Sequence, residues 1–107
     1  MRVHDDGLID ELLEPGEVLE VRARAGGATI AITNRRLAVL EAERVALAVD
    51  IGLVRRVQFD IEKSRPATLV IVPERPSDAP QVLAVPAEDY EFVADALVVI
   101  GRRLASA

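Results

Sequence analysis

Cysteine and tryptophan are absent from this 107-residue sequence, and it holds a single histidine. Without cysteine the chain has no disulfide, no thiol nucleophile and no cysteine-bound zinc, and His4 alone is too little for a histidine metal site. A chain of this length buries enough surface to fold without a disulfide or a bound metal. We therefore expect one domain over residues 1–107, with no metal and no cofactor, in a reducing compartment.

Long apolar runs are missing as well. The longest apolar stretch near the C-terminal end, residues 92–100, is interrupted by Asp95 and is far shorter than the ~20 residues that a membrane span needs. Residues 1–6 hold no apolar core of a secretion signal. These absences favour a cytoplasmic protein.

Positive charge is in deficit. The chain carries 13 Lys and Arg against 18 Asp and Glu, a net charge of −5, and Lys63 is its only lysine. Non-specific binding to nucleic acid or to an anionic membrane depends on an excess of basic residues on one face. We expect no nucleic-acid partner, and membrane binding is disfavoured.

The residues of a catalytic set are not brought together by any motif. Ser64, Ser77 and Ser106 lie in expected loops or the tail, without the sharp turn that exposes a nucleophilic serine. The carboxylate pairs Asp5-Asp6 and Glu88-Asp89 stand where helix capping explains them. We expect a protein that is not an enzyme and takes no small-molecule substrate.

What the sequence does contain is a series of short apolar and polar alternations. A short helix is expected at about residues 6–14, capped by Asp5 or Asp6 and stopped by Pro15-Gly16. A final helix is expected at about 87–104, with an apolar stripe formed by Phe92, Val93, Ala96, Leu97, Ile100 and Leu104. Between them, period-two patterns predict seven strands within residues 17–85, at about 17–25, 28–33, 36–41, 44–51, 57–62, 67–72 and 81–85.

No segment between these strands is long enough for a crossover helix, so the strands must run antiparallel in a sandwich or barrel with one end covered by the final helix. The inward parity of the strands and the helix stripe predict a shared core. Its expected members are Ile30, Ile32, Leu37, Val39, Val57, Phe59 and Leu97, and Ile61 is expected to point inward with them.

Four segments, in order, carry a resemblance to a known family. They are Leu13-Glu14-Pro15-Gly16-Glu17, Thr33-Asn34-Arg35-Arg36-Leu37, Val54-Arg55-Arg56-Val57 and the closing helix. Over residues 8–104 the chain resembles bacterial pleckstrin-homology-like (PH-like) domains of the YokE-like/GRAM-like branch. The resemblance implies a β-barrel or split barrel of about seven antiparallel strands capped by a C-terminal α-helix. It also implies a non-catalytic protein-interaction or self-assembly module, and a homo-oligomer is possible.

Two arginine pairs are the candidates for binding an anion: Arg35, Arg36, Arg55 and Arg56. The planar guanidinium matches a carboxylate or phosphate. The alternative function is therefore binding of an anionic ligand or membrane headgroup through this Arg-rich face. The opposing interpretation is internal ion pairing, for which Asp50, Asp60 and Glu62 are available.

A phosphoinositide site of the eukaryotic PH type is not expected. Arg22 and Arg24 project from one face of the first strand, but the loop that follows is only Gly26-Gly27, too short to wrap a headgroup. We expect these two arginines to be solvated and paired with Glu20 or a neighbouring strand.

Apolar residues off the expected core face are the candidates for an interface. Val98 and Val99 lie away from the apolar stripe of the final helix and are expected to face solvent or a partner. The outer faces of the strands are also apolar, through Ala31, Ala46, Ala48, Val70 and Val72. Such surplus marks either a binding surface or scattered surface hydrophobes in a chain rich in valine and alanine.

Overall fold

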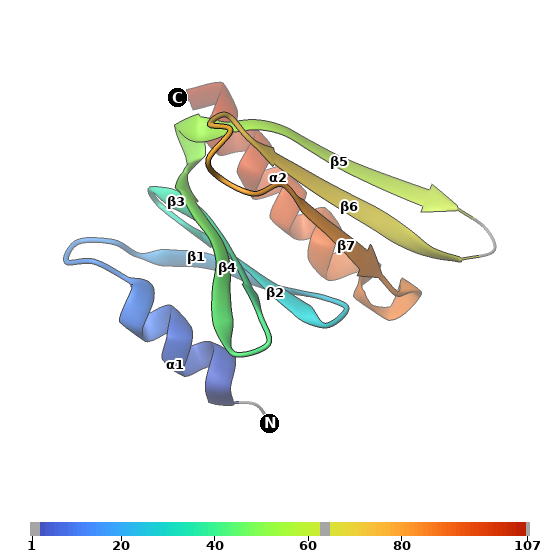
Figure 1. The fold of residues 1–107 in the computed structure, drawn as a ribbon, viewed down its shortest axis with the longest axis horizontal. Helices are drawn as coiled ribbons and strands as arrows, with labels where there is room; N and C mark the ends of the chain where they lie inside the picture. Colours follow the sequence, from blue (N-terminus) through green and yellow to red (C-terminus); the bar gives the residue numbers. More distant parts are fainter. Residues whose placement is uncertain (1–2, 63–64, 107) are drawn as a thin grey trace.

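The computed structural model describes residues 3–62 and 65–106. In this part of the chain, two α-helices flank seven strands, and two 3-10 turns, η1 and η2, precede β5 and α2 (Figure 1). The elements are α1 (Val3–Leu12), β1 (Leu19–Ala25), β2 (Ala28–Thr33), β3 (Arg36–Glu41), β4 (Arg44–Asp50), η1 (Ile51–Leu53), β5 (Val54–Glu62), β6 (Arg65–Pro73), β7 (Gln81–Val85), η2 (Ala87–Asp89) and α2 (Tyr90–Ser106).

The strands form two antiparallel sheets, a four-stranded sheet ordered β1-β2-β3-β4 and a three-stranded sheet ordered β5-β6-β7. Each strand pairs with its neighbour in sequence, because every connection within a sheet is a short turn or loop. The expected mainly β fold with a C-terminal helix is confirmed. The two sheets are not joined into a closed barrel within the described residues, because no strand ladder links β4 to β5 or β1 to β7.

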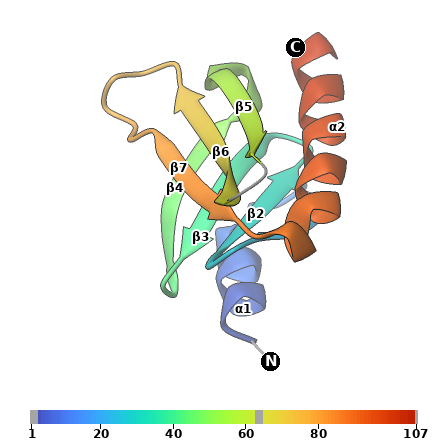
Figure 2. The same cartoon turned by 90° about the vertical axis from the view of Figure 1, so that its right-hand side faces the viewer.

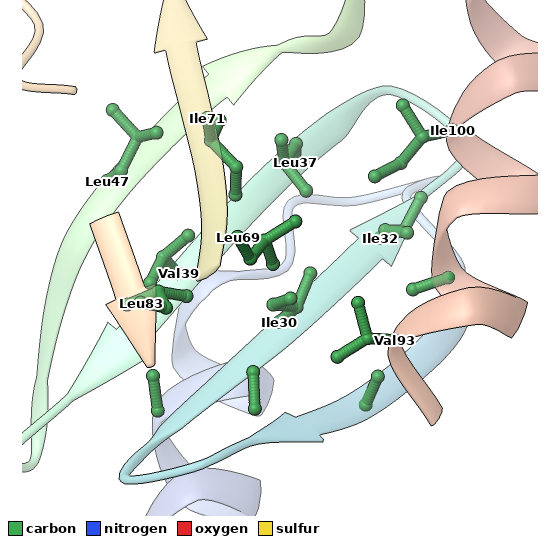
Figure 3. Packing of buried hydrophobic residues seen from close by; sticks show 14 of the residues in the cluster. Ile30, Ile32, Leu37, Val39, Leu47, Leu69, Ile71, Leu83, Val93 and Ile100 are labelled. Atoms are coloured by element: carbon green, nitrogen blue, oxygen red, sulfur yellow. The ribbon is translucent and has the colours of Figure 1, made fainter. Parts of the chain in front are cut away.

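The main core lies between the two sheets and α2. Ile30, Ile32, Leu37 and Val39 project from β2 and β3 toward Leu69 and Ile71 of β6, and Val93 and Ile100 of α2 close the side (Figure 3). The predicted burial of the four residues on β2 and β3 is confirmed, since each is at most 1% exposed. Val57, Phe59 and Leu97 are only partly buried and pack at the margin of this core.

A second, smaller core lies on the other face of the four-stranded sheet, which α1 covers (Figure 2). Ile9 of α1 packs against Ala31, Ala38 and Leu40, and Ala48 is partly buried at the same place. The expectation that Ala31 and Ala48 lie on an uncovered outer face is therefore wrong. Small residues at these positions let the helix approach the sheet closely.

The apolar stripe of α2 is narrower than expected. Val93, Ala96 and Ile100 are buried, whereas Phe92 and Leu104 are 49% and 37% exposed. The helix packs mainly along β1, so only one side of it faces the core.

The β5–β6 hairpin extends past the core. β5 and β6 are each nine residues long and β7 is five, and the far end of the hairpin projects beyond β7 (Figure 1). Ile61, expected to point inward, is 59% exposed because it lies on this projecting end.

Several boundaries also differ from expectation. α1 begins at Val3, so Asp5 and Asp6 lie inside it and not at its cap. β6 begins at Arg65, so the Arg65-Pro66 pair belongs to a strand, and Ser64 lies outside the described residues.

Candidate functional site

Asn34 sets the turn between β2 and β3 that carries the first arginine pair. Its side-chain oxygen accepts a hydrogen bond from the Val18 N–H at 2.9 Å, and its amide group donates to the Gly16 carbonyl at 3.4 Å. The Thr33 hydroxyl accepts from the backbone N–H groups of Arg35 and Arg36 at 3.1 and 2.8 Å. Thr33 thus supplies the local side-chain bonds that stabilise the turn, and Asn34 ties the turn to the segment that precedes β1.

The guanidinium of Arg36 forms an ion pair with a buried carboxylate, that of Glu17. Glu17 Oε2 accepts from Arg36 Nε at 2.9 Å and Glu17 Oε1 accepts from Arg36 Nη2 at 2.6 Å, a two-point ion pair. The same carboxylate accepts from the Thr33 hydroxyl at 2.6 Å and from the Glu14 N–H at 3.0 Å. Arg36 Nη2 also donates to the Leu12 carbonyl at the end of α1, at 2.6 Å. We call Leu12, Glu14, Glu17, Thr33 and Arg36 the Glu17 cluster.

The electrostatics of the Glu17 cluster follow from this geometry. The hydrogen bonds from Arg36 lower the pKa of Glu17 from 4.5 to about 2, against the opposing effect of burial. The same pairing raises the pKa of Arg36. Both groups therefore stay charged at neutral pH, and the Glu17 side chain is wholly buried while Arg36 is 16% exposed.

Arg35 also pairs within the chain, although less tightly. Its Nη1 lies 3.3 Å from Glu14 Oε1, and its Nη2 donates to the Pro15 carbonyl at 3.3 Å. The expected partners Asp50, Asp60 and Glu62 are thus wrong for hydrogen bonding of the first pair. The actual partners, Glu14 and Glu17, come from Leu13-Glu14-Pro15-Gly16-Glu17, another of the four segments that carry the resemblance, so these two motifs bind each other.

Arg55 and Arg56 stand apart from this arrangement. Both are exposed at the start of β5, and neither has an ion-pair partner within residues 3–62 and 65–106. The Arg35 carbonyl accepts from the Ile51 N–H at 2.9 Å, so the β2–β3 turn lies next to η1, which precedes Arg55. The doublets share one end of the molecule, but only the second offers unpaired guanidinium groups.

A second buried carboxylate, Asp89 in η2, was missed as a contact residue by the sequence reasoning. Asp89 Oδ2 accepts from the Gly26 N–H at 2.9 Å, and Oδ1 lies 3.6 Å from Arg24 Nε. Helix capping is therefore not its role, because it holds the β1–β2 turn instead. Glu20, the expected partner of Arg22 or Arg24, bonds to Arg103 of α2, whose Nε donates at 3.0 Å.

Gly26 itself is required by this contact. It has φ of +65°, and a Cβ at this position would collide with the Ala84 carbonyl of β7. The Gly-Gly pair predicted a hairpin turn, but only the fold reveals that the turn docks between β7 and η2.

The expected interface residues fall on two surfaces. Val98 of α2 is 53% exposed, as expected, whereas Val99 is half-buried against the main core, which contradicts the expectation that it faces solvent. Val70 and Val72 are half-buried on the outer face of β6. The register adds Val82 of β7, which pairs across the strands with Val70 and is 68% exposed.

The outer faces of the two sheets differ in their covering. α1 lies on the four-stranded sheet, and no helix among the described residues lies on the outer face of the three-stranded sheet (Figure 2). Ala46, the remaining expected outer-face residue, packs instead at the margin of the main core. Among the described residues, exposed Val82 and half-buried Val70 and Val72 therefore form a contiguous apolar patch on β6 and β7, while α2 exposes Phe92, Val98 and Leu104.

Residues 3–62 and 65–106 contain neither a membrane-spanning helix nor a cluster of metal-ligating side chains. The helices there are too short or too polar to cross a membrane. The described His, Asp and Glu residues form no group of three that could hold a metal ion.

Comparisons of the chain with protein families, with functionally characterised proteins and with solved structures give no match.

Proposed function

We propose that this chain is a non-catalytic PH-like module that binds another protein chain through its three-stranded sheet, either a partner protein or a second copy. One observation carries the proposal. Within the described residues no helix covers the outer face of β5-β6-β7, where exposed Val82 lies beside half-buried Val70 and Val72. Contiguous exposed apolar side chains on a small domain commonly mark an interface.

Neighbouring residues favour this surface over the helix. Val98 is flanked on α2 by exposed polar residues, Asp95 one turn before and Arg102 one turn after. The other exposed apolar side chains of the helix, Phe92 and Leu104, are each six residues away and so about 120° around the helix from it. Val82 faces Val70 directly across the β6–β7 ladder, and Val72 is next along the same face of β6. An apolar partner side chain placed there meets several valines at once.

The electrostatics favour protein binding over anion binding. The Arg-rich face would need several free guanidinium groups, but Arg35 and Arg36 are already bonded to Glu14 and Glu17. A ligand competing for Arg36 would have to displace a carboxylate bound at two points, which is costly because Glu17 would be left buried and charged. Arg55 and Arg56 alone make a small target.

The test compares two single substitutions by light scattering and by capture of proteins from an extract of the source cells. Val82→Glu places a charge on the sheet and Val98→Glu places the same charge on the helix, and circular dichroism verifies that both variants fold. We expect self-association or retention of a stoichiometric partner to be lost only in Val82→Glu. Loss only in Val98→Glu moves the interface to α2, and a parent that neither self-associates nor retains a partner refutes the proposal.

A further inference from the structure

The free edge of the three-stranded sheet is β5. It pairs with β6 on one side, and no strand pairs with its other side in the described part of the chain. The backbone N–H and C=O groups of such an edge are available to another strand. The opposite edge, β7, is shorter and has the β1–β2 turn docked on it at Ala84.

Regular geometry on β5 is confined to a short stretch. The register with β6 shifts between Val54 and Arg56 and again between Asp60 and Glu62, which marks a bulge at each end. Residues 56–60 between these bulges pair one-to-one with β6 and are centred on Gln58. Bulges limit where an added strand can pair, so this stretch defines the available register.

The sequence of this stretch complements itself when it is read in the opposite direction. If two copies pair antiparallel about Gln58, Arg56 of each copy faces Asp60 of the other, and Val57 faces Phe59. Opposite charges and apolar pairs placed directly across strands are stabilising. Arg56 and Asp60 lie on the outer face with Gln58, and Val57 and Phe59 lie on the core side, so both faces match at once.

In the monomer, the side chains of residues 56–60 are available to a second strand. Arg56 has no ion-pair partner within residues 3–62 and 65–106, and Asp60 receives a hydrogen bond only from Gln58 Nε2, on Oδ2 at 2.8 Å. Val57 and Phe59 are half-buried at the margin of the core, with Phe59 edge-on to Tyr90 at 5.8 Å. A strand added at β5 would cover the exposed side of both.

We propose that two copies of this chain associate through β5 in antiparallel register about Gln58, to form one continuous six-stranded sheet. This inference rests on the proposed function and names the occupant, a second copy. The joined sheet presents the valines of β6 and β7 from both copies on one face.

Another edge strand, β4, is a less regular template for pairing. Its sequence is also symmetric, with Arg44 opposite Asp50 about Leu47. However, its register with β3 shifts between Val39 and Leu40, so a bulge at Ala46 interrupts the stretch that would pair. The regular stretch of β5 is the better template.

A charge swap tests the dimer. The dissociation constant is measured by sedimentation equilibrium for the parent, for Arg56→Asp, for Asp60→Arg and for the variant that carries both. Each single change places like charges opposite each other twice, so we expect dimer affinity to fall by about 10-fold or more. The double change restores two opposite-charge pairs and should recover the parent affinity. Asp95→Arg, on exposed α2, is the control for net charge and should dimerise like the parent.

Cysteine cross-linking tests the register, because the chain has no cysteine of its own. Gln58→Cys places two thiols on the symmetry axis, where the Cα separation of facing residues suits a disulfide. We expect disulfide-linked dimers under mild oxidation from Gln58→Cys and not from Asp95→Cys. Arg56→Cys and Asp60→Cys should cross-link to each other when mixed, but not alone.

The outcomes separate this inference from the proposed function. A parent that stays monomeric at high micromolar concentration, or a double swap that fails to recover affinity, overturns pairing through β5. If in that case Val82→Glu still abolishes binding of a partner protein, the proposed function stands and only the second copy is excluded. A third outcome is that Val82→Glu abolishes dimerisation whereas Arg56→Asp leaves it intact. This result would place the contact on the face of the sheet and not on its edge, and would overturn pairing through β5.

Discussion

Glu17 is the residue whose charge contributes most clearly to the stability of the fold. Its pKa is lowered to about 2 in the folded protein from 4.5, so the charged form is the one that folding favours. The stabilisation is fully present above about pH 4.5 and is lost as the pH falls toward 2. Acid therefore weakens the connection between α1 and the β2–β3 turn.

We predict that Glu17→Gln removes a large part of the acid sensitivity of the protein. For the parent, this one group contributes on the order of 3 kcal/mol to the fall in unfolding free energy between pH 5 and pH 2. Urea titrations across this range measure the slope, with Glu11→Gln, at an exposed position of α1 outside the Glu17 cluster, as control. Equal pH dependence in parent and Glu17→Gln would show that Glu17 is not the responsible carboxylate.

We predict that Gly26→Ala destabilises the protein and that Gly27→Ala does not. Gly26 combines a positive φ with a close approach to the Ala84 carbonyl, whereas a Cβ at Gly27 meets nothing within 4 Å. The expected cost at Gly26 is about 2–4 kcal/mol, and at Gly27 the change should stay within about 0.5 kcal/mol. Thermal unfolding of the two variants measures these changes in stability. Similar losses of stability in Gly26→Ala and Gly27→Ala would mean that the contact with the Ala84 carbonyl is not the cause.

At the scale of the elements, α1 is an integral layer and not a peripheral lid. Its Ile9 is 2% exposed and fills the small core formed with Ala31, Ala38 and Leu40. The Glu17 cluster reinforces this placement, since Arg36 bonds to the last turn of the helix at Leu12. The four-stranded sheet is therefore covered on both faces.

We predict that Ile9→Ala lowers the unfolding free energy by about 2–4 kcal/mol, because it leaves a cavity between α1 and the sheet. Glu11→Ala, on the exposed side of the same helix, should cost less than about 0.5 kcal/mol. Chemical denaturation of both variants provides the comparison. A loss below about 1 kcal/mol for Ile9→Ala would mean that α1 is only loosely attached.

The sequence predicted the elements well and their contacts poorly, for a physical reason. Alternation along a strand reports which parity is apolar, and it located β7 at residues 81–85 and β2 at 28–33 as observed. It does not report what covers a face, so the burial of Ala31 under α1 was missed. Nor does it report where a strand projects beyond the core, so Ile61 was assigned inward.

The same limit applies to the candidate site: its residues were recognisable in the sequence, but their contacts were not. Arginine pairs in turns and strand ends were recognisable, but their partners depend on which distant segments the fold brings together. Glu17 lies 19 residues from Arg36, and Asp89 lies 63 residues from Gly26. One signal in the sequence could have indicated the contact between Glu17 and Arg36. Two motifs of complementary charge occur in it, Leu-Glu-Pro-Gly-Glu and Thr-Asn-Arg-Arg-Leu.

At the scale of the whole molecule, charge argues against recruitment to anionic membranes. The net charge is −5, and half of the candidate Arg-rich face is bonded internally. The remaining pair, Arg55 and Arg56, must overcome repulsion from the rest of the chain.

We predict no co-sedimentation with vesicles that contain phosphoinositides, at physiological salt, above the level seen with neutral vesicles. Arg55→Glu should leave this background unchanged. Binding to anionic vesicles alone, abolished by Arg55→Glu, would contradict the prediction and support the anion-binding function.

The contact between Asp89 and Gly26 also joins the first sheet to a segment that is synthesised much later. The first helix and the four-stranded sheet are complete by Asp50, and their ladders join neighbours in sequence, so this half closes only short loops. The hydrogen bond that holds the β1–β2 turn comes from a residue 63 positions later. We expect the core side of the first sheet to stay open to water during synthesis until β6 and α2, which cover it in the folded protein, have been made. Its valines and isoleucines are most prone to aggregation in that interval, which ends when α2 packs along β1.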